Sequence, residues 1–181
     1  MQLITVAAFA SAALAAPAAQ SACTKAAQDL TFSIKDFTFD SQAIYSTPSH
    51  LATSEGHVDF DLAVSAKKQP IHCSADSVST YPSYFDGQTW YDCEASDTFS
   101  AQFKYDLDTG LVKIKANWQC PDASFQASGK HVVEEEEDCD TETKTNKHWS
   151  LEHPGKFYQK ITTTCADTLT TFKPSKISAV A

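Results

Sequence analysis

The chain has 181 residues and a formal net charge of −9, from 23 acidic residues against 14 lysines and no arginine. Binding to nucleic acid or to an anionic membrane relies on a basic footprint, so this composition argues against both partners. The length suits one folded domain with a core of useful size.

An apolar segment opens the chain. It runs almost unbroken from Leu3 to Ala16, and Ala13-Leu14-Ala15 satisfies the small-x-small rule for cleavage after Ala15. The run is shorter than the about 20 residues that span a bilayer. We therefore predict a signal peptide over residues 1–15, a secreted, extracellular mature protein, and an N-terminal leader over residues 16–29.

Alternation of apolar and polar residues dominates the remainder. Val58, Phe60 and Leu62 share one face of a segment whose other face carries Asp59 and Asp61. A period of two with one apolar face is typical of a half-buried β-strand.

The clearest hairpin follows. Alternating segments over residues 99–105 and 112–118 flank a turn that contains Gly110. Around nine or ten short strands of this kind fit into residues 30–173, which predicts a single all-β domain, either a barrel or a sandwich. The small and polar residues 174–181 are predicted to form a flexible tail.

Six cysteines follow the predicted cleavage point, and an even number in an exported chain predicts a disulfide framework. Six thiols allow fifteen pairings, and the sequence does not choose among them. Neighbouring cysteines are nineteen or more positions apart, unlike the close pairs of a zinc site, so we expect no metal and no other cofactor. The six are Cys23, Cys73, Cys93, Cys120, Cys139 and Cys165.

No catalytic motif is present. The Ser, Asp and His residues form neither G-x-S-x-G nor H-E-x-x-H, so we assign no catalytic residue and expect a protein that is not an enzyme. A secreted hydrolase with paired carboxylates from distant positions is the least favoured alternative.

Two groups of residues are candidate partner contacts. Tyr81 and Tyr84 lie in a predicted exposed loop, whereas Trp90 and Trp118, near strand cysteines, are expected in the core. An acidic run lacks the glycine of an EF-hand and is interpreted as a solvated loop rather than a calcium site. Its candidate contacts are Glu134, Glu135, Glu136 and Glu137.

Several short motifs together resemble one known family. Cys73-Ser74-Ala75 is followed by Trp90-Tyr91-x-Cys93, and the aromatic strand that begins at Phe32 and the segments around Phe103 and Gly110 come in the same order. This pattern, over about residues 30 to 120, resembles the Alternaria major allergen family of small secreted fungal proteins.

The resemblance implies an antiparallel β-barrel stapled by disulfides, with Cys73 paired to Cys93 and Cys120 to Cys139. The lone N-terminal cysteine of the family links two subunits, and Cys23 occupies that place. Cys165 is an additional thiol, so pairing of Cys23 with Cys165 stays open, as does Cys120 with Cys165 alongside Cys23 with Cys139. Monomer and homodimer both stay open.

The resemblance also implies a non-catalytic function. We expect a cysteine-rich fungal effector or elicitor that binds an extracellular protein of a plant host and modulates its defence, a role in virulence. The alternative is a module that binds a small phenolic molecule or a carbohydrate, because a barrel of this size can hold one small ligand.

Overall fold

The computed structural model describes residues 20–49, 52–79, 84–133, 139–153, 155–166 and 169–180. The predicted signal peptide and the candidate contacts Tyr81 and Glu134 to Glu137 lie outside these residues. The described elements are α1 (Ala22–Ala26), the 3-10 helix η1 (Ala27–Asp29) and the strands β1 (Phe32–Tyr45), β2 (Ala52–Val64), β3 (Ile71–Ser79), β4 (Tyr91–Asp92), β5 (Phe99–Asp106), β6 (Leu111–Gln119), β7 (Ser124–Val132), β8 (Cys139–Thr145), β9 (Gln159–Ala166), β10 (Thr170–Phe172) and β11 (Lys176–Val180).

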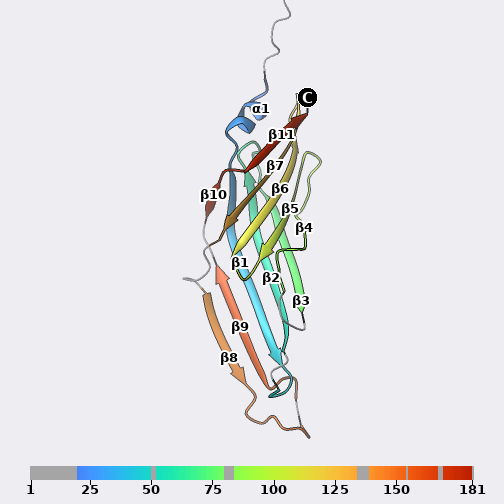
Figure 1. Ribbon diagram of the computed structural model, residues 1–181, viewed down its shortest axis with the longest axis vertical. Helices are drawn as coiled ribbons and strands as arrows, with labels where there is room; N and C mark the ends of the chain where they lie inside the picture. The colour runs from blue at the N-terminus through green and yellow to red at the C-terminus, as the bar shows by residue number, and fades with distance from the viewer. Residues whose placement is uncertain are drawn as a thin grey trace, which may run out of the picture.

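The strands form two antiparallel sheets (Figure 1). The larger sheet has the order β3-β2-β1-β9-β8, with β10 also paired to β1, and the smaller sheet has the order β11-β7-β6-β5-β4. The prediction of an all-β, disulfide-stapled antiparallel fold is confirmed. A closed barrel is not confirmed, because the strand pairings of the described residues stay within the two separate sheets.

The core lies between the sheets. The predicted alternation of β2 is confirmed, since Val58, Phe60 and Leu62 are fully buried, and the ring of Phe60 meets that of Phe103 edge-on at 4.9 Å. Removing a side chain of this size from water contributes roughly 1.5–3 kcal/mol. Burial of these apolar faces therefore holds the two sheets together.

The predicted hairpin is also confirmed. Strands β5 and β6 pair along their whole length, and Gly110 in the intervening turn has a φ of 61°. A Cβ at this position would lie 2.7 Å from the carbonyl oxygen of Val133, so the turn requires glycine for both its conformation and its close packing.

The sheets meet at one seam without a shared ladder. The Cys73–Cys93 disulfide crosses it, and the backbone N–H of Glu94 donates to the carbonyl oxygen of His72 at 2.7 Å. At the opposite side, the chain itself passes from β10 in the larger sheet to β11 in the smaller one. Alternation identifies strands that face a core but does not reveal which sheet edges pair, which is why the sequence could not exclude an open arrangement.

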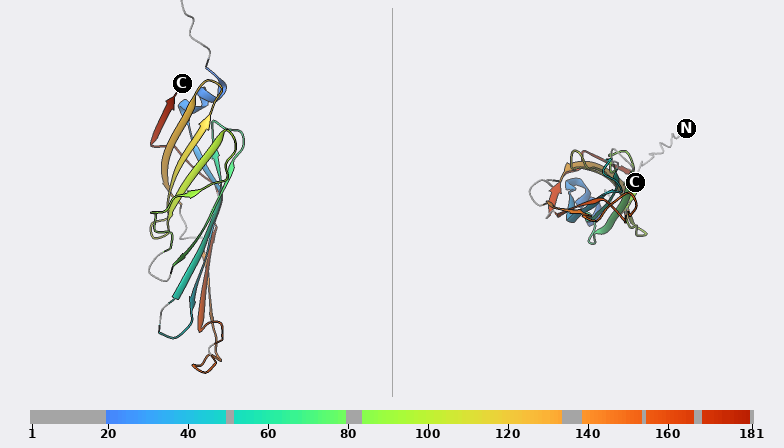
Figure 2. Two further views of the ribbon diagram at one scale, coloured as in Figure 1. Left: turned by 90° about the vertical axis from the view of Figure 1, so that its right-hand side faces the viewer. Right: turned by 90° about the horizontal axis from the view of Figure 1, so that it is seen from below.

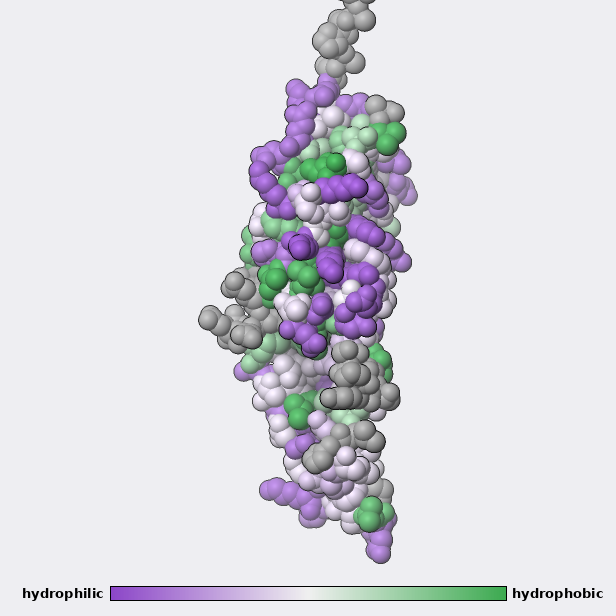
Figure 3. All heavy atoms as spheres, in the orientation of Figure 1, coloured by the Kyte–Doolittle hydropathy of each residue, from purple (hydrophilic) through white to green (hydrophobic). Residues whose placement is uncertain are grey.

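The larger sheet is longer than the smaller one. Its strands β1 and β2 have 14 and 13 residues, against 8 and 9 in β5 and β6, and they run on with β8 and β9 beyond the smaller sheet (Figures 1 and 2). All seven residues of β8 are exposed. The lower part of the molecule is mostly of intermediate hydropathy in Figure 3, as expected for a single-layer extension rich in Thr and Ser.

The disulfides join Cys23 to Cys120, Cys73 to Cys93 and Cys139 to Cys165. The Cys73–Cys93 pair agrees with the resemblance, but the implied Cys120–Cys139 pair is wrong, as are both alternatives that paired Cys23 with Cys165 or Cys139. Cys139 lies directly opposite Cys165 in the β8–β9 ladder of the larger sheet, whereas Cys120 follows β6 in the smaller sheet. Cys23 is bonded within its own chain rather than to a second subunit.

Both ends of the described chain carry regular structure. The side chain of Ser21 caps α1, and the carboxylate of Asp122 accepts hydrogen bonds from Ser21 and Thr24, which lowers the pKa of Asp122 to about 2. At the other end, residues 176–180 pair with β7 as β11, so the expected flexible tail over residues 174–181 is wrong for these five residues. Within the residues that the structure describes, no helix has the length and apolar character needed to cross a membrane.

Candidate functional site

Acidic side chains gather on the outer face of the larger sheet. The ladder registers place Asp140, Asp40 and Asp76 in one row across the sheet, with Glu142 and Glu55 in the next row. Asp59 and Asp61 continue this face along β2, alternating with the buried residues. We call these seven residues the acidic face: Asp40, Glu55, Asp59, Asp61, Asp76, Asp140 and Glu142.

Two imidazoles lie between carboxylates of the acidic face. His57 Nδ1 is 2.8 Å from Asp76 Oδ1, and His72 Nε2 is 3.0 Å from Asp59 Oδ2. His72 Nδ1 also lies 3.4 Å from Asp61. These contacts tie β2 to β3 along their outer side and hold the side chains of both strands in place.

Lysines gather on the outer face of the smaller sheet. Lys104 of β5 lies directly opposite Lys113 of β6, which in turn lies opposite Lys130 of β7. Lys115 lies two residues after Lys113, on the same face of β6. Ser128 of β7 is opposite Lys115, and Lys176 of β11 is opposite Ser128. We call these five residues the lysine face: Lys104, Lys113, Lys115, Lys130 and Lys176.

The lysine face has no neutralising partner among the described residues. None of its five ammonium groups lies within 4.0 Å of a carboxylate there, although the chain has 23 acidic residues. Within the described parts of the chain, the lysine ion pairs are those of Lys144 with Glu142 and of Lys173 with Asp29. Five of the 14 lysines therefore share one sheet face without an ion pair, in a protein whose net charge is negative.

Trp90 belongs to the lysine face. The ammonium groups of Lys104 and Lys115 lie 5.0 and 4.1 Å from its ring centre, and the side chain is half-buried. The expectation that Trp90 packs in the core is wrong, because its neighbour Tyr91 turns inward against Phe103. The same expectation is confirmed for Trp118, which is 2 % exposed.

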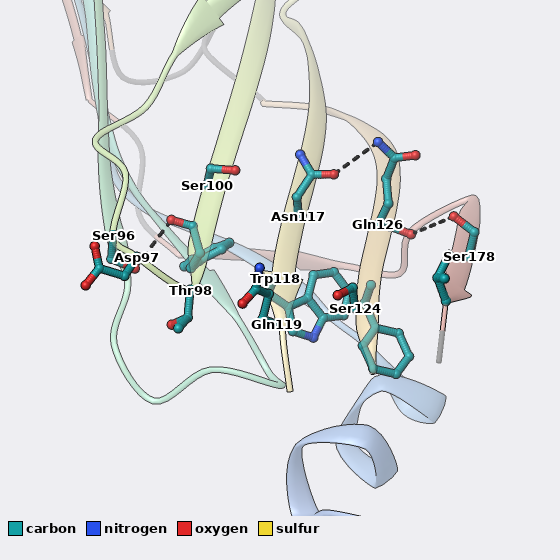
Figure 4. A pocket seen from close by; sticks show the side chains of 13 residues that line it. Ser96, Asp97, Thr98, Ser100, Asn117, Trp118, Gln119, Ser124, Gln126 and Ser178 are labelled. Carbon is teal, nitrogen blue, oxygen red and sulfur yellow. Dashed lines mark hydrogen bonds between the residues drawn. The ribbon is translucent and has the colours of Figure 1, made fainter. Parts of the chain in front are cut away.

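A shallow hollow of about 390 Å³ lies beside the lysine face (Figure 4). Ser100, Asn117, Gln126 and Ser178 form a polar row across it, and Gln126 Nε2 donates to Asn117 Oδ1 at 3.0 Å. Trp118 also lines the hollow, and its indole Nε1 is buried without a hydrogen-bond partner in the described part of the chain. Such a donor is normally satisfied.

Tyr84, a predicted exposed contact, lies on the inner side of the larger sheet. Its ring is half-buried and stacks on Phe39 at 6.2 Å, with Gly56 directly beneath it. A Cβ at Gly56 would lie 2.4 Å from the Tyr84 ring, so the absence of a side chain there makes room for the tyrosine. The structure therefore does not bring Tyr84 to either charged face.

The two charged faces were not among the predicted contacts. The alternation of β6 already placed Lys113 and Lys115 outward, but only the register of three strands brings Lys104 and Lys130 beside them. The acidic face likewise assembles residues from four strands. Cross-strand register was the missing information.

A comparison with protein families settles the kinship. The family model described as Alternaria alternata allergen 1 matches residues 34–165, which is more than half of the chain. The chain belongs to the Alternaria alternata allergen 1 family. Comparisons with curated proteins and with solved structures give no match. The part that matches this allergen family contains the whole acidic face, Trp90 and every residue of the lysine face except Lys176.

Proposed function

We propose that this member of the allergen family is a secreted effector or elicitor that acts without catalysis, by binding an extracellular protein of a plant host and modulating its defence. Family membership and three disulfides support an exported, rigid protein. The observation that carries the proposal is the acidic face, which has seven carboxylates on one side of a braced sheet, one of them, Glu142, paired with Lys144.

The acidic face suits a partner with a basic surface. Complementary potentials steer two proteins together and discriminate against partners of the wrong charge. The contacts of His57 and His72 with Asp59 and Asp76 hold part of this face in a fixed arrangement, so little order has to be imposed on binding. Binding should therefore weaken as salt rises.

The test compares the oxidised mature protein with two charge-matched variants in a leaf defence assay such as the oxidative burst. The variant D40N/E55Q/D76N removes three carboxylates of the acidic face, and D108N/E152Q/E94Q removes three carboxylates elsewhere. We expect the first variant to lose its effect on the burst and the second to keep it.

Two outcomes would contradict the proposal. Equal activity of boiled, reduced protein would show that no folded surface is needed, and equal loss in both variants would show that total charge alone matters. Circular dichroism of both variants establishes that each retains the β-sheet fold.

A second function is favoured by the hollow beside Trp118. A small phenolic or sugar seated there would meet the hydroxyl and amide groups of Ser100, Asn117 and Gln126. In a W90F/W149F variant Trp118 is the sole indole, so its fluorescence reports directly on this hollow. Saturable quenching by a flavonol or by an oligosaccharide would support this function, and flat titrations with both would remove it.

A further inference from the structure

We infer that the lysine face with Trp90 is a binding site for an anionic polysaccharide built from carboxylated sugars. The site lies on the smaller sheet, opposite to the acidic face, and the inference does not rest on the proposed function. It would allow the protein to be retained on a polyuronate matrix while the acidic face stays accessible.

The first argument is the register of the lysines. Like charges directly opposite each other on neighbouring strands are destabilising, and this sheet has two such pairs in succession, Lys104 with Lys113 and Lys113 with Lys130. Two carboxylates, Asp92 and Asp106, lie on the same outer face, but no carboxylate among the described residues lies within 4.0 Å of these ammonium groups. A bound polyanion would offset the repulsion, with several carboxylates meeting several ammonium groups at once.

The second argument is the surroundings of these charges. Beside the lysines, the same face presents the amides and hydroxyls of Gln102, Asn117, Gln126 and Ser100, which suit the hydroxyl groups of a sugar chain. Asp92 also lies on this face and accepts a hydrogen bond from Gln102 Nε2 at 2.8 Å. Trp90 adds a half-buried aromatic ring that holds the ammonium groups of Lys104 and Lys115 over it, so an anionic sugar bound by these lysines would lie against the indole. Figure 3 looks onto this side of the molecule and shows hydrophilic residues over its middle, with hydrophobic residues between them.

The third argument is that the charge of the protein favours a polyuronate over nucleic acid as the bound polymer. Duplex DNA carries one charge per about 1.7 Å, and its binding draws on a strongly basic protein surface. Here five lysines are opposed by a net charge of −9 for the whole chain. A polymer with one carboxylate on each sugar has a lower charge density and is repelled less by the rest of the protein.

The experiment measures binding of the oxidised mature protein to polygalacturonate by affinity electrophoresis, with dextran as the neutral polymer and single-stranded DNA as the other polyanion. The variant K104Q/K113Q/K130Q removes three charges from the lysine face. The matched variant K25Q/K68Q/K156Q removes three exposed charges elsewhere and changes the net charge equally.

We expect the native protein to bind polygalacturonate at low salt and not dextran. The lysine-face variant should bind roughly tenfold more weakly, since each exposed ion pair contributes modestly, and the matched variant should stay within about twofold of the native protein. Fluorescence of Trp90 in a W118F/W149F variant should change on binding, which a purely distant charge effect would not produce.

Three results would overturn the inference: no binding by the native protein, equal weakening in both variants, or tighter binding to single-stranded DNA than to polygalacturonate. A loss of the defence effect in the acidic-face variant with polygalacturonate binding intact would show that the two surfaces act separately. The two proposals can therefore fail independently.

Discussion

The Cys73–Cys93 disulfide should be a principal staple between the two sheets, and C73A/C93A tests this. The bond spans 20 positions, and closing a loop of that length contributes about 3 kcal/mol through the reduced entropy of the unfolded chain. Both sulfurs are also buried, with Cys73 at 0 % and Cys93 at 7 % exposure. Cavities left by such truncations add about 1 kcal/mol, so we expect a total loss of about 4 kcal/mol.

The assay is urea unfolding of the oxidised mature protein, with thermal unfolding as a second measure. For a domain of this size, 4 kcal/mol corresponds to a decrease in Tm of roughly 8–16 °C. The comparison variant is C139S/C165S, which opens a loop spanning 26 positions at the edge strand β8 and should lose a similar amount through chain entropy, but without loosening the contact between the two sheets. Two results would show that this bond does not hold the seam. One is a loss of less than about 1.5 kcal/mol in the free energy of unfolding of C73A/C93A, and the other is hydrogen-exchange protection of both sheets equal to that of the native protein.

Three further perturbations test the packing and the termini. G110A should lower the free energy of unfolding, measured in urea, by about 1–2 kcal/mol. G155A should lower it less, because Gly155 has a similar φ of 62° but faces only a side-chain amide. Equal losses would contradict the argument from close packing. F60A should lose roughly 3–5 kcal/mol, because the ring is fully buried between the sheets, and a loss below 1 kcal/mol would place the core elsewhere. The pKa of Asp122 is lowered from 3.8 to about 2, so its hydrogen bonds stabilise the fold above about pH 4 and are lost as the pH falls toward 2; the stability difference between D122N and the native protein should shrink over that interval.

The elements that face the core could be predicted from the sequence because burial imposes a period of two. Val58, Phe60 and Leu62 had to share a face, and Gly110 had to occupy the turn of the hairpin. Which edges pair is decided by contacts between distant segments, so Cys139 meets Cys165 rather than Cys120. Residues 176–180 form a strand for the same reason: β7 offers an edge that a local reading of the tail does not include.

The candidate site was less predictable than the fold. Trp90 was expected in the core because it stands near Cys93, but a shift of one residue along a strand reverses the side to which it points. Tyr84 was expected outside because its neighbours suggest a loop, yet it packs on Phe39 in the space left by Gly56. Both outcomes depend on three-dimensional neighbours that lie far away in the chain.

The grouping of five lysines on one sheet face and of seven carboxylates on the other is not explained by folding. Outward positions on a strand are not constrained by the core, and opposite charges placed across from each other would each contribute roughly 0.2–1 kcal/mol. Lys113 lies between Lys104 and Lys130 instead, and Asp40 is in one row with Asp76 and Asp140. The lysine face thus lacks ion pairs that the composition would allow, whereas the larger sheet keeps the pair of Glu142 with Lys144. Such an arrangement of charges makes the isolated protein less stable than its composition would allow, and a bound partner of opposite charge would compensate for this. We therefore propose a basic partner for the larger sheet and an acidic polymer for the smaller one.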